Sequence, residues 1–216
     1  MEEVGTVGKK WLRAKRRDYY YRRAKRENYR SRAAYKLKQI NERFHVIRRG
    51  YTVVDLGSSP GGWSQVAMEI VGPTGKVVAV DMASMRPLDG VTFIRGDARE
   101  DGTLRRVLEA AGGRVDAVIS DMAPNISGHY ATDHARSMEL ARVCLEFSLR
   151  CLSRRGVMVV KVFQGDLFPD YLKEVKRHFE SVRCHSPRAS RRSSSEMYVI
   201  AKNPLPPANR RVLPVL

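Results

Sequence analysis

The stretch Asp55-Leu-Gly-Ser-Ser-Pro-Gly-Gly-Trp63 follows an apolar, β-branched run and precedes a helix-like run. A strand that leads into a glycine-rich turn and then a helix is typical of the nucleotide-binding corner of a doubly wound α/β sheet. Gly57, Gly61 and Gly62 permit positive φ and let backbone approach a ligand where a Cβ would collide. The stretch therefore predicts a Rossmann-like fold with a ligand at this turn.

The turn also indicates which ligand to expect. It is not GxGxxG, which argues against a dinucleotide and its pyrophosphate. An acidic residue, Asp81, closes the next apolar run and is placed to accept hydrogen bonds from ribose hydroxyls. A glycine turn that serves packing alone is the alternative, but strand, turn, helix, strand and acid in this order favour a nucleoside without phosphates. S-adenosylmethionine (SAM) is the candidate cofactor.

Short β-branched runs alternate with amphipathic segments, which predicts one α/β domain with a mostly parallel sheet and helices on both faces. The expected strands are 51–56, 76–81, 91–95, 115–120, 156–162, 180–185 and 196–202. The expected helices are 31–43, capped by Ser31, and 62–71, 103–111, 133–152 and 169–178. Only about ten residues separate the last two strands, too few for a helical crossover, so we expect a terminal antiparallel hairpin. Seven strands ending in a hairpin fit a SAM-methyltransferase sheet better than a dehydrogenase.

The net charge of +17 is concentrated at the N-terminus. Residues 1–50 carry 17 Lys/Arg against 5 Asp/Glu, so +12 (17 − 5) of the total lies there. We divide the chain into a basic arm (1–30), a catalytic domain (31–203) and a proline-rich tail (204–216). Aromatic rings are interleaved with the charges of the arm, which favours RNA contact over a solvated tail. A membrane surface is disfavoured, because no apolar face accompanies the basic one. These rings belong to Trp11, Tyr19, Tyr20, Tyr21 and Tyr29.

Cysteine and histidine suggest no further site. Cys144, Cys151 and Cys184 are odd in number and lack CxxC spacing, so we expect buried thiols in a reducing cytoplasm. The histidines show no paired ligand spacing, and we predict no metal. No apolar run reaches transmembrane length, and the N-terminus lacks the hydrophobic core of a signal peptide. We also expect a monomer, with no additional RNA-binding module after the C-terminus.

Reactive side chains are expected beyond the carboxyl ends of the strands. Asp121 follows the run 115–120, Lys161 ends the run 156–160, and Glu196 opens the reversed final strand, which brings its start to the same rim. Lys36, on the helix before the first strand, is the fourth candidate. Singly, each residue also fits a structural role, such as a turn cap or a surface ion pair. A charged cluster at a cofactor pocket is less often incidental.

Five motifs resemble the RrmJ/FtsJ family of large-subunit ribosomal RNA methyltransferases, which modify a uridine 2′-hydroxyl. They are SRAAYKL (31–37), DLGSSPGGWSQ (55–65), SDMAPNISG (120–128), KVFQGD (161–166) and SSEMYVIA (194–201), and the resemblance spans residues 31–202. The long basic, tyrosine-rich arm departs from the bacterial pattern and points to an archaeal-type member.

The resemblance implies roles for particular residues. The family's Lys-Asp-Lys-Glu catalytic set falls on the four residues that the strand ends already select, and its SAM contacts fall on five positions. The catalytic set is Lys36, Asp121, Lys161 and Glu196, and the SAM contacts are Gly61, Trp63, Asp81, Asp97 and Asp121, with Gly57 in the same turn. The implied partner is 23S ribosomal RNA, within the large ribosomal subunit.

A ribose 2′-hydroxyl needs a positioned base to remove its proton. Lys161 is the expected base, since desolvation or a neighbouring cation such as Lys36 favours a neutral amine. In a weaker version, Lys161 only orients the hydroxyl and water takes the proton. Trp63 is expected beside the cofactor, although a packing role at a helix start is the alternative.

Three other functions stay open at this stage. The same motifs fit a 2′-O-methyltransferase for tRNA or for capped mRNA. A non-catalytic ribosome-assembly factor would explain the arm but not the retained charged set. A nicotinamide dehydrogenase is disfavoured by the absent GxGxxG and the terminal hairpin.

Overall fold

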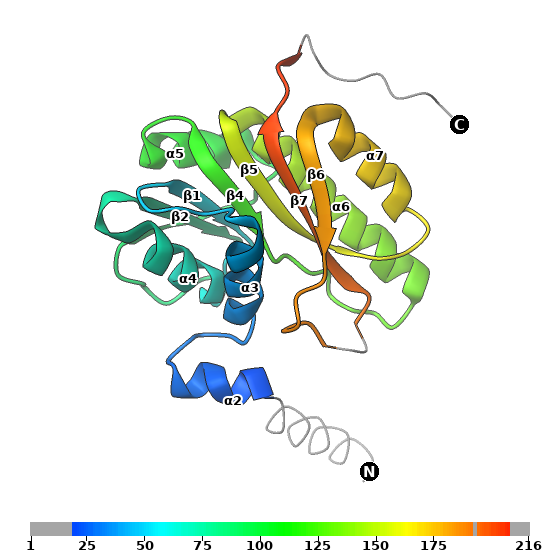
Figure 1. Ribbon diagram of the computed structural model, residues 1–216, viewed down its shortest axis with the longest axis horizontal. Coiled ribbons are helices and arrows are strands. Elements are labelled where there is room, and N and C mark those ends of the chain that lie inside the picture. The colour runs from blue at the N-terminus through cyan, green and yellow to red at the C-terminus, as the bar shows by residue number, and fades with distance from the viewer. Residues whose placement is uncertain (1–18, 192–193, 208–216) are drawn as a thin grey trace.

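The computed structural model describes residues 19–191 and 194–207, and helices separate most of its strands along the chain (Figure 1). The helices are α2 (Tyr19–Arg26), α3 (Ala34–Phe44), α4 (Gly62–Val71), the 3₁₀ turn η1 (Gly72–Thr74), α5 (Asp101–Ala111), α6 (Tyr130–Cys151) and α7 (Phe168–His178). The strands are β1 (Thr52–Leu56), β2 (Lys76–Asp81), β3 (Val91–Arg95), β4 (Val115–Ser120), β5 (Leu152–Phe163), β6 (Phe179–His185) and β7 (Glu196–Pro204).

The strands form one seven-stranded sheet in the order β3-β2-β1-β4-β5-β7-β6. The neighbours from β3 to β5 pair in parallel, while β7 runs antiparallel to both β5 and β6. The predicted fold class and the predicted terminal hairpin are therefore confirmed. Because β7 is reversed, its first residue lies at the edge where the parallel strands end.

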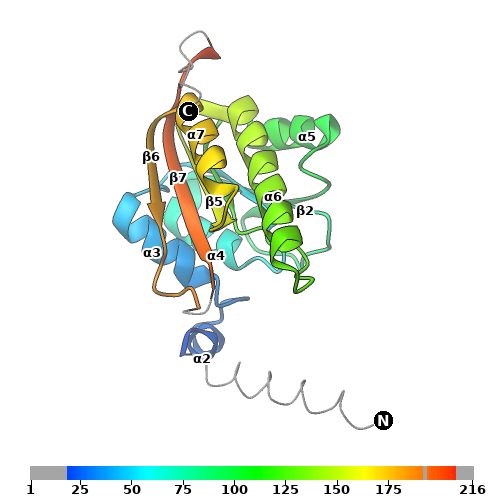
Figure 2. The same cartoon turned by 90° about the vertical axis from the view of Figure 1, so that its right-hand side faces the viewer.

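Helices cover both faces of this sheet. Figure 2 shows α3 and α4 on one side and α5, α6 and α7 on the other. Alternate residues of a strand serve the two layers: Val53 packs with α3 and α4, whereas Val54 packs with the opposite helices. Strands buried on both faces are expected to be continuously apolar, which is why β1 and β2 stand out in the sequence.

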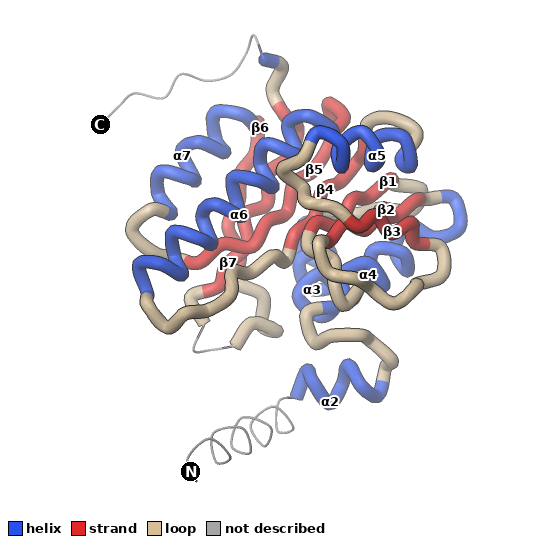
Figure 3. The backbone as a smooth tube through the Cα atoms, turned by 180° about the vertical axis from the view of Figure 1, so that it is seen from behind, coloured by secondary structure: helices blue, strands red, loops and turns tan. Residues whose placement is uncertain are grey.

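The described part of the basic arm is helical and docked. In Figure 3, α2 lies beyond the end of the sheet, next to the start of α3. Tyr35 of α3 packs against Tyr20 and Tyr29, with ring centroids 5.4 and 5.6 Å apart. Tyr29 Oη donates to Glu69 at 2.7 Å, and Ala24 is buried. Some of the aromatic residues expected to stack on RNA therefore pack against the body. Residues 1–18, with Trp11, and residues 208–216 of the predicted tail lie outside the described residues.

The predicted N-cap of α3 is wrong. The helix begins at Ala34 rather than Ser31, and no side chain caps it. Ser31 Oγ lies 2.2 Å from where a Cβ on Gly62 would stand, so Ser31 packs against the start of α4 instead. The carbonyl oxygen of Ala33 accepts a hydrogen bond from Trp63 Nε1 at 2.8 Å. Contacts from α4 thus place the start of α3.

The other differences from the sequence prediction are small. Helix α6 begins at Tyr130, three residues early, and β5 begins at Leu152, four residues early. Cys144 and Cys151 are buried as expected, but Cys184 is exposed on the edge strand β6. Strand edges offer less cover than the layers, and single-residue burial there is not encoded in local sequence.

Within residues 19–191 and 194–207, no helix is both long and apolar enough to cross a membrane. The same residues contain no group of three or more His, Cys, Asp or Glu side chains arranged to hold a metal ion.

Two glycines allow a direct test of the packing between β1 and β2. A Cβ on Gly75 would lie 2.4 Å from Val71 Cβ and 2.7 Å from the carbonyl oxygen of Tyr51, whereas a Cβ on Gly102 would meet nothing within 4 Å. We expect Gly75→Ala to lower the free energy of unfolding by about 1–3 kcal/mol. Gly102→Ala, in α5, should be no less stable than wild type. Urea unfolding followed by circular dichroism checks both, and equal effects would contradict the packing.

Candidate active site

The four residues of the predicted catalytic set lie together at one edge of the sheet. Lys36 Nζ is 2.7 Å from Glu196 Oε2 and 3.7 Å from Asp121 Oδ1. Lys161 Nζ is 3.0 Å from Asp121 Oδ1 and also donates to the carbonyl oxygen of Asp121. Far apart in sequence, these four side chains form one cluster, which we call the charged tetrad.

Strand register explains why they meet. Asp121 follows β4 and Lys161 lies near the end of β5, two parallel neighbours whose carboxyl ends share an edge. Glu196 is the first residue of β7 and pairs with Phe163 of β5. Lys36 reaches the same edge from α3, which packs on the sheet beside β1 and β4. A parallel β7 would place Glu196 at the opposite end of the sheet.

Three members of the charged tetrad are nearly closed to water, and the tetrad as a whole is balanced in charge. Lys36, Lys161 and Glu196 are 9%, 7% and 8% exposed. Two ammonium groups face two carboxylates, which offsets the cost of burying each charge. Burial tends to raise the pKa of Asp121, but the ammonium groups of Lys161 and Lys36 outweigh it and hold that pKa below its ordinary value.

Tyr198 is a further member of this site that the sequence analysis did not select. Its hydroxyl donates to Asp121 Oδ1 at 2.6 Å. Burial, together with the charge of Asp121, raises the pKa of Tyr198 well above its ordinary value, so the hydroxyl stays a donor. The signal was present in the sequence: Tyr198 stands two residues after Glu196 on β7, and alternate residues of a strand share a face.

The loop between β6 and β7 fixes Glu196 in place. Ser190 Oγ donates to Glu196 Oε1 at 2.6 Å, which leaves Oε2 to Lys36. The loop itself is held by α3, because the backbone N–H of Ala189 donates to Gln39 Oε1 at 3.0 Å. The Arg32 guanidinium donates to the carbonyl oxygen of Ala189 at 2.5 Å.

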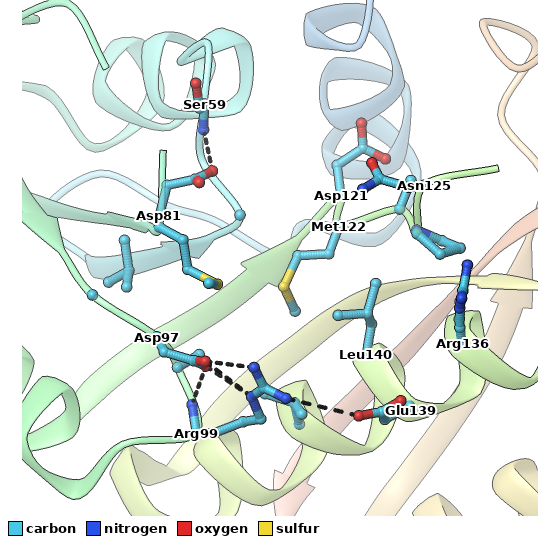
Figure 4. A pocket seen from close by; sticks show the side chains of 18 residues that line it. Ser59, Asp81, Asp97, Arg99, Asp121, Met122, Asn125, Arg136, Glu139 and Leu140 are labelled. Atoms are coloured by element: carbon cyan, nitrogen blue, oxygen red, sulfur yellow. Dashed lines mark hydrogen bonds and ion pairs between the residues drawn. The ribbon is translucent and has the colours of Figure 1, made fainter. Parts of the chain in front are cut away.

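A cavity of about 720 Å³ lies beside the charged tetrad, and Figure 4 shows it from close by. Acidic residues from three strand ends, Asp81, Asp97 and Asp121, line it. Apolar side chains form much of the rest of its wall, namely Val80, Met82, Met122, Leu140 and Val143. Asp121 belongs to both the cavity and the tetrad, so it joins the two parts of the site.

The glycine turn forms one side of the cavity. Gly57 lines it with φ +72°, and a Cβ there would lie 2.2 Å from Met122 Cγ. Gly61 has φ +105° and precedes α4, but it is not among the lining residues. Gly62 has no positive φ, contrary to expectation, and needs to be glycine because Ser31 approaches it. Positive φ at Gly57 and Gly61 agrees with the turn expected from the sequence.

Trp63 does not line the cavity. Its indole is 3% exposed, packs beside Tyr198 with ring centroids 5.6 Å apart, and uses its only donor on the backbone of Ala33. This arrangement favours the packing role over cofactor contact. A cofactor contact by Trp63 or Gly61 remains a prediction from family resemblance.

The two other acids of the cavity are already held by protein groups. Asp81 accepts hydrogen bonds from the backbone N–H groups of Ser59 and Ala83, each at 2.8 Å. Asp97 is bound by the Arg99 guanidinium at 2.6 and 3.0 Å, and this side-chain hydrogen bonding lowers the pKa of Asp97. Arg99 also lies 3.9 Å from Glu139 (Figure 4). Arg99 is not among the site residues that the sequence analysis selected.

The lining suits SAM, the cofactor expected from the glycine turn. Carboxylates accept hydrogen bonds from ribose hydroxyls and amino groups, and they favour a cofactor that carries positive charge. The apolar wall formed by Met122, Leu140 and Val143 suits a flat base. Gly57 leaves the space that a Cβ would close.

Asp55 lies under this turn and is the one carboxyl of β1. It is 1% exposed, Ser64 Oγ donates to its Oδ2 at 2.6 Å, and its Oδ1 has no hydrogen-bond partner among the described residues. Burial raises the pKa of Asp55 to about 7, with the charges of Asp121 and Asp81 acting in the same direction. A neutral carboxyl therefore supports the glycine turn below that pH.

Comparison with known proteins finds methyltransferases among the relatives of this chain. The FtsJ-like methyltransferase family matches residues 29–204. The ribosomal RNA large subunit methyltransferase E of Methanothrix thermoacetophila is 55% identical over 186 residues, which cover 86% of this chain and 72% of the relative. Most of the described chain therefore has a curated counterpart.

Solved structures share the fold. A protein assigned as a ribosomal RNA methyltransferase from Plasmodium falciparum superposes with a TM-score of 0.73 at 28% identity, covering 82% of this chain and 99% of that chain. Aeropyrum pernix fibrillarin, crystallised with natively bound SAM, gives a TM-score of 0.58 at 17% identity, covering 80% and 75%. The second likeness concerns the fold alone.

The raised pKa of Asp55 predicts a pH-dependent stability. Its folded value of about 7 lies above the ordinary 3.8, so the folded state binds more protons between these values, and stability falls as pH rises through this window. We expect wild type to lose stability relative to Asp55→Asn between about pH 5 and about pH 8. Urea unfolding at several pH values measures the difference. A constant difference across the range would show that Asp55 ionises normally.

Proposed function

The chain belongs to the FtsJ-like methyltransferase family, and from this premise we propose that it methylates a ribose 2′-hydroxyl of large-subunit ribosomal RNA. The cofactor is S-adenosylmethionine. The observation that carries the proposal is the charged tetrad beside the acidic cavity, with Asp121 common to both. Such an arrangement would hold a proton-accepting group next to a bound methyl donor.

We assign the cofactor to the cavity. Asp81 would accept from the ribose hydroxyls, because each of its oxygens has a lone pair beyond the one used by backbone. Asp97 would accept from the adenine amino group, with Arg99 beside it. Gly57 would allow close approach of the nucleoside. When bound, SAM supplies an activated methyl group to an attacking oxygen.

We assign the general-base role to Lys161. A neutral amine there would take the proton of the 2′-hydroxyl as the new carbon–oxygen bond forms. With both lysines protonated, the charged tetrad contains two positive and two negative groups. A neutral Lys161 leaves one excess negative charge, so accepting the ribose proton restores the balance. Asp121 and Glu196 would orient the two amines, since each lies within 3.0 Å of one of them.

The substrate assignment follows the relatives. The curated counterpart in Methanothrix thermoacetophila is named for the large ribosomal subunit, and the resemblance implies a uridine of 23S ribosomal RNA. The basic N-terminal arm suits a polyanion, and its binding should weaken as salt rises. We propose that the protein acts in the cytoplasm as a monomer, on RNA within the large ribosomal subunit.

Lys161→Ala should separate cofactor binding from chemistry. Lys161 does not line the cavity, and without it Asp121 keeps Lys36 and Tyr198, so SAM affinity measured by calorimetry should be preserved. The single-turnover methylation rate should fall by at least roughly 100-fold. Lys173→Ala, a change at a lysine of α7 whose side chain is 45% exposed, is the matched control and should behave as wild type. A near-normal rate for Lys161→Ala would remove the base assignment.

The choice of RNA is tested by methyl acceptance. Undermethylated large ribosomal subunits, naked 23S ribosomal RNA and tRNA are each incubated with the protein and labelled SAM. We expect label in the large-subunit RNA, at a 2′-O position located by ribose-methylation mapping. Label in tRNA alone would favour a tRNA enzyme, and SAM binding without label in any RNA would favour a non-catalytic assembly factor.

A further inference from the structure

An exposed aromatic surface lies outside the charged tetrad and the cofactor cavity. Tyr130, the first residue of α6, is 59% exposed, and two apolar neighbours in the same region, Ile126 and Leu167, are 65% and 41% exposed. Large exposed apolar side chains are few among the described residues, and three of them come from the loop before α6, its first turn and the start of α7. Such a group indicates a contact surface rather than chance exposure.

The Tyr130 ring is held in place from one side. It stacks on the buried imidazole of His134, with centroids 5.8 Å apart and an angle of 12° between the rings. His134 Nε2 in turn accepts from the backbone N–H of Leu167 at 3.0 Å. A Cβ on Gly165 would lie 2.4 Å from Tyr130 Oη and 2.8 Å from the imidazole, so the absence of a side chain there is required. One face of the tyrosine is covered, and the ring remains exposed to solvent.

The loop that precedes Tyr130 is also pinned. The Asp133 carboxylate accepts from the backbone N–H and the hydroxyl of Ser127, both at 2.8 Å, and from the N–H of Gly128 at 3.1 Å. The ring therefore has a defined position before any ligand arrives. A rigid ring loses little conformational freedom on binding, which favours its use as a contact.

Two chain segments connect this surface to the charged tetrad. Asp121 opens the loop that leads to Tyr130, and Gly165 stands four residues after Lys161, at most about 14 Å along the chain. The N–H of Gln164 donates to the carbonyl oxygen of Ser195, the residue before Glu196. Figures 2 and 3 both place the beginning of α6 at the end of the sheet where β7 starts.

We propose that the exposed face of Tyr130 stacks on a base that flanks the methylated nucleotide; this inference rests on the proposed function. An RNA strand whose target ribose lies at Lys161 must continue in both directions past the edge of the sheet that carries the charged tetrad. Single-stranded RNA is recognised largely by stacking of unpaired bases on aromatic rings, and such stacking tolerates different sequences. Ile126 and Leu167 add exposed apolar side chains on the two segments that flank this region. The net charge of +17 favours a polyanion such as RNA, rather than another protein, as the partner that covers Tyr130.

The test uses the full chain and a short RNA that spans the methylated nucleotide once it is mapped. Tyr130→Ala should raise the RNA concentration needed for half-maximal rate by roughly 10- to 100-fold, the range expected for one lost base stack. The rate at saturating RNA and the SAM affinity should stay as in wild type. Tyr130→Phe keeps the ring and should behave as wild type, and Thr132→Ala, an exposed change in the same helical turn, is the matched control.

A modified RNA identifies the stacked base directly. Replacing the nucleotides on each side of the target, one at a time, by abasic residues should weaken wild type at one position and leave Tyr130→Ala unaffected at that position. Equal sensitivity of both proteins at every position would overturn the proposal, as would an unchanged RNA requirement for Tyr130→Ala. A defect on ribosomal subunits but not on naked RNA would assign the surface to a protein contact instead. If wild type methylates no RNA, the proposed function fails, which is a different result.

Discussion

The charged tetrad depends on one carboxylate, that of Asp121. It faces the ammonium groups of Lys161 and Lys36 at 3.0 and 3.7 Å and accepts the Tyr198 hydroxyl, so it joins α3, β5 and β7 at one point. The Asp121 side chain is only 18% exposed, so its charge would be costly without partners, and the buried ammonium groups would be equally costly without it. The cluster is therefore a constraint on the fold as well as a chemical device. It can form only when helix, parallel strand and reversed strand are all in register.

The reversal of β7 is the topological condition for this cluster. In an all-parallel sheet every strand presents its carboxyl end at the reactive edge, and the beginnings of strands lie at the other end. The short β6–β7 connection changes this for one strand, so a residue at the start of β7 meets residues at the ends of β4 and β5. The positions of Glu196 and Tyr198 in the site both depend on this reversal of β7. The loop that makes the turn then holds Glu196 through Ser190, which leaves one carboxylate oxygen for Lys36.

The sequence predicted the features that follow from periodicity and strand ends, and it missed side-chain contacts that neither pattern marks. Asp121, Lys161 and Glu196 could be selected because topology alone brings strand ends together. Arg99 could not, because it contacts Asp97 within the irregular turn after β3, where no periodic signal marks it. Trp63 stood in the cofactor motif, yet the approach of α3 to α4 gave its indole N–H a backbone partner and buried the ring. Local sequence does not state how close two helices come.

The docked part of the basic arm is connected to Glu196 through a chain of side-chain contacts. Tyr20 packs on Tyr35 and accepts from Gln39, and Gln39 binds the backbone of Ala189 in the loop that carries Ser190. Ser190 binds Glu196. Each link is a hydrogen bond or ring contact between neighbouring segments, so a change in how α2 packs would pass to the loop before it reaches the charged tetrad. Substitutions at packed positions of α2, such as Tyr20, would therefore act on the support of Glu196, whereas charge changes at its exposed positions would act only on the basic surface. Under the proposed function, the exposed positions of α2 would contribute to RNA affinity and its packed positions to turnover, so the two effects are separable.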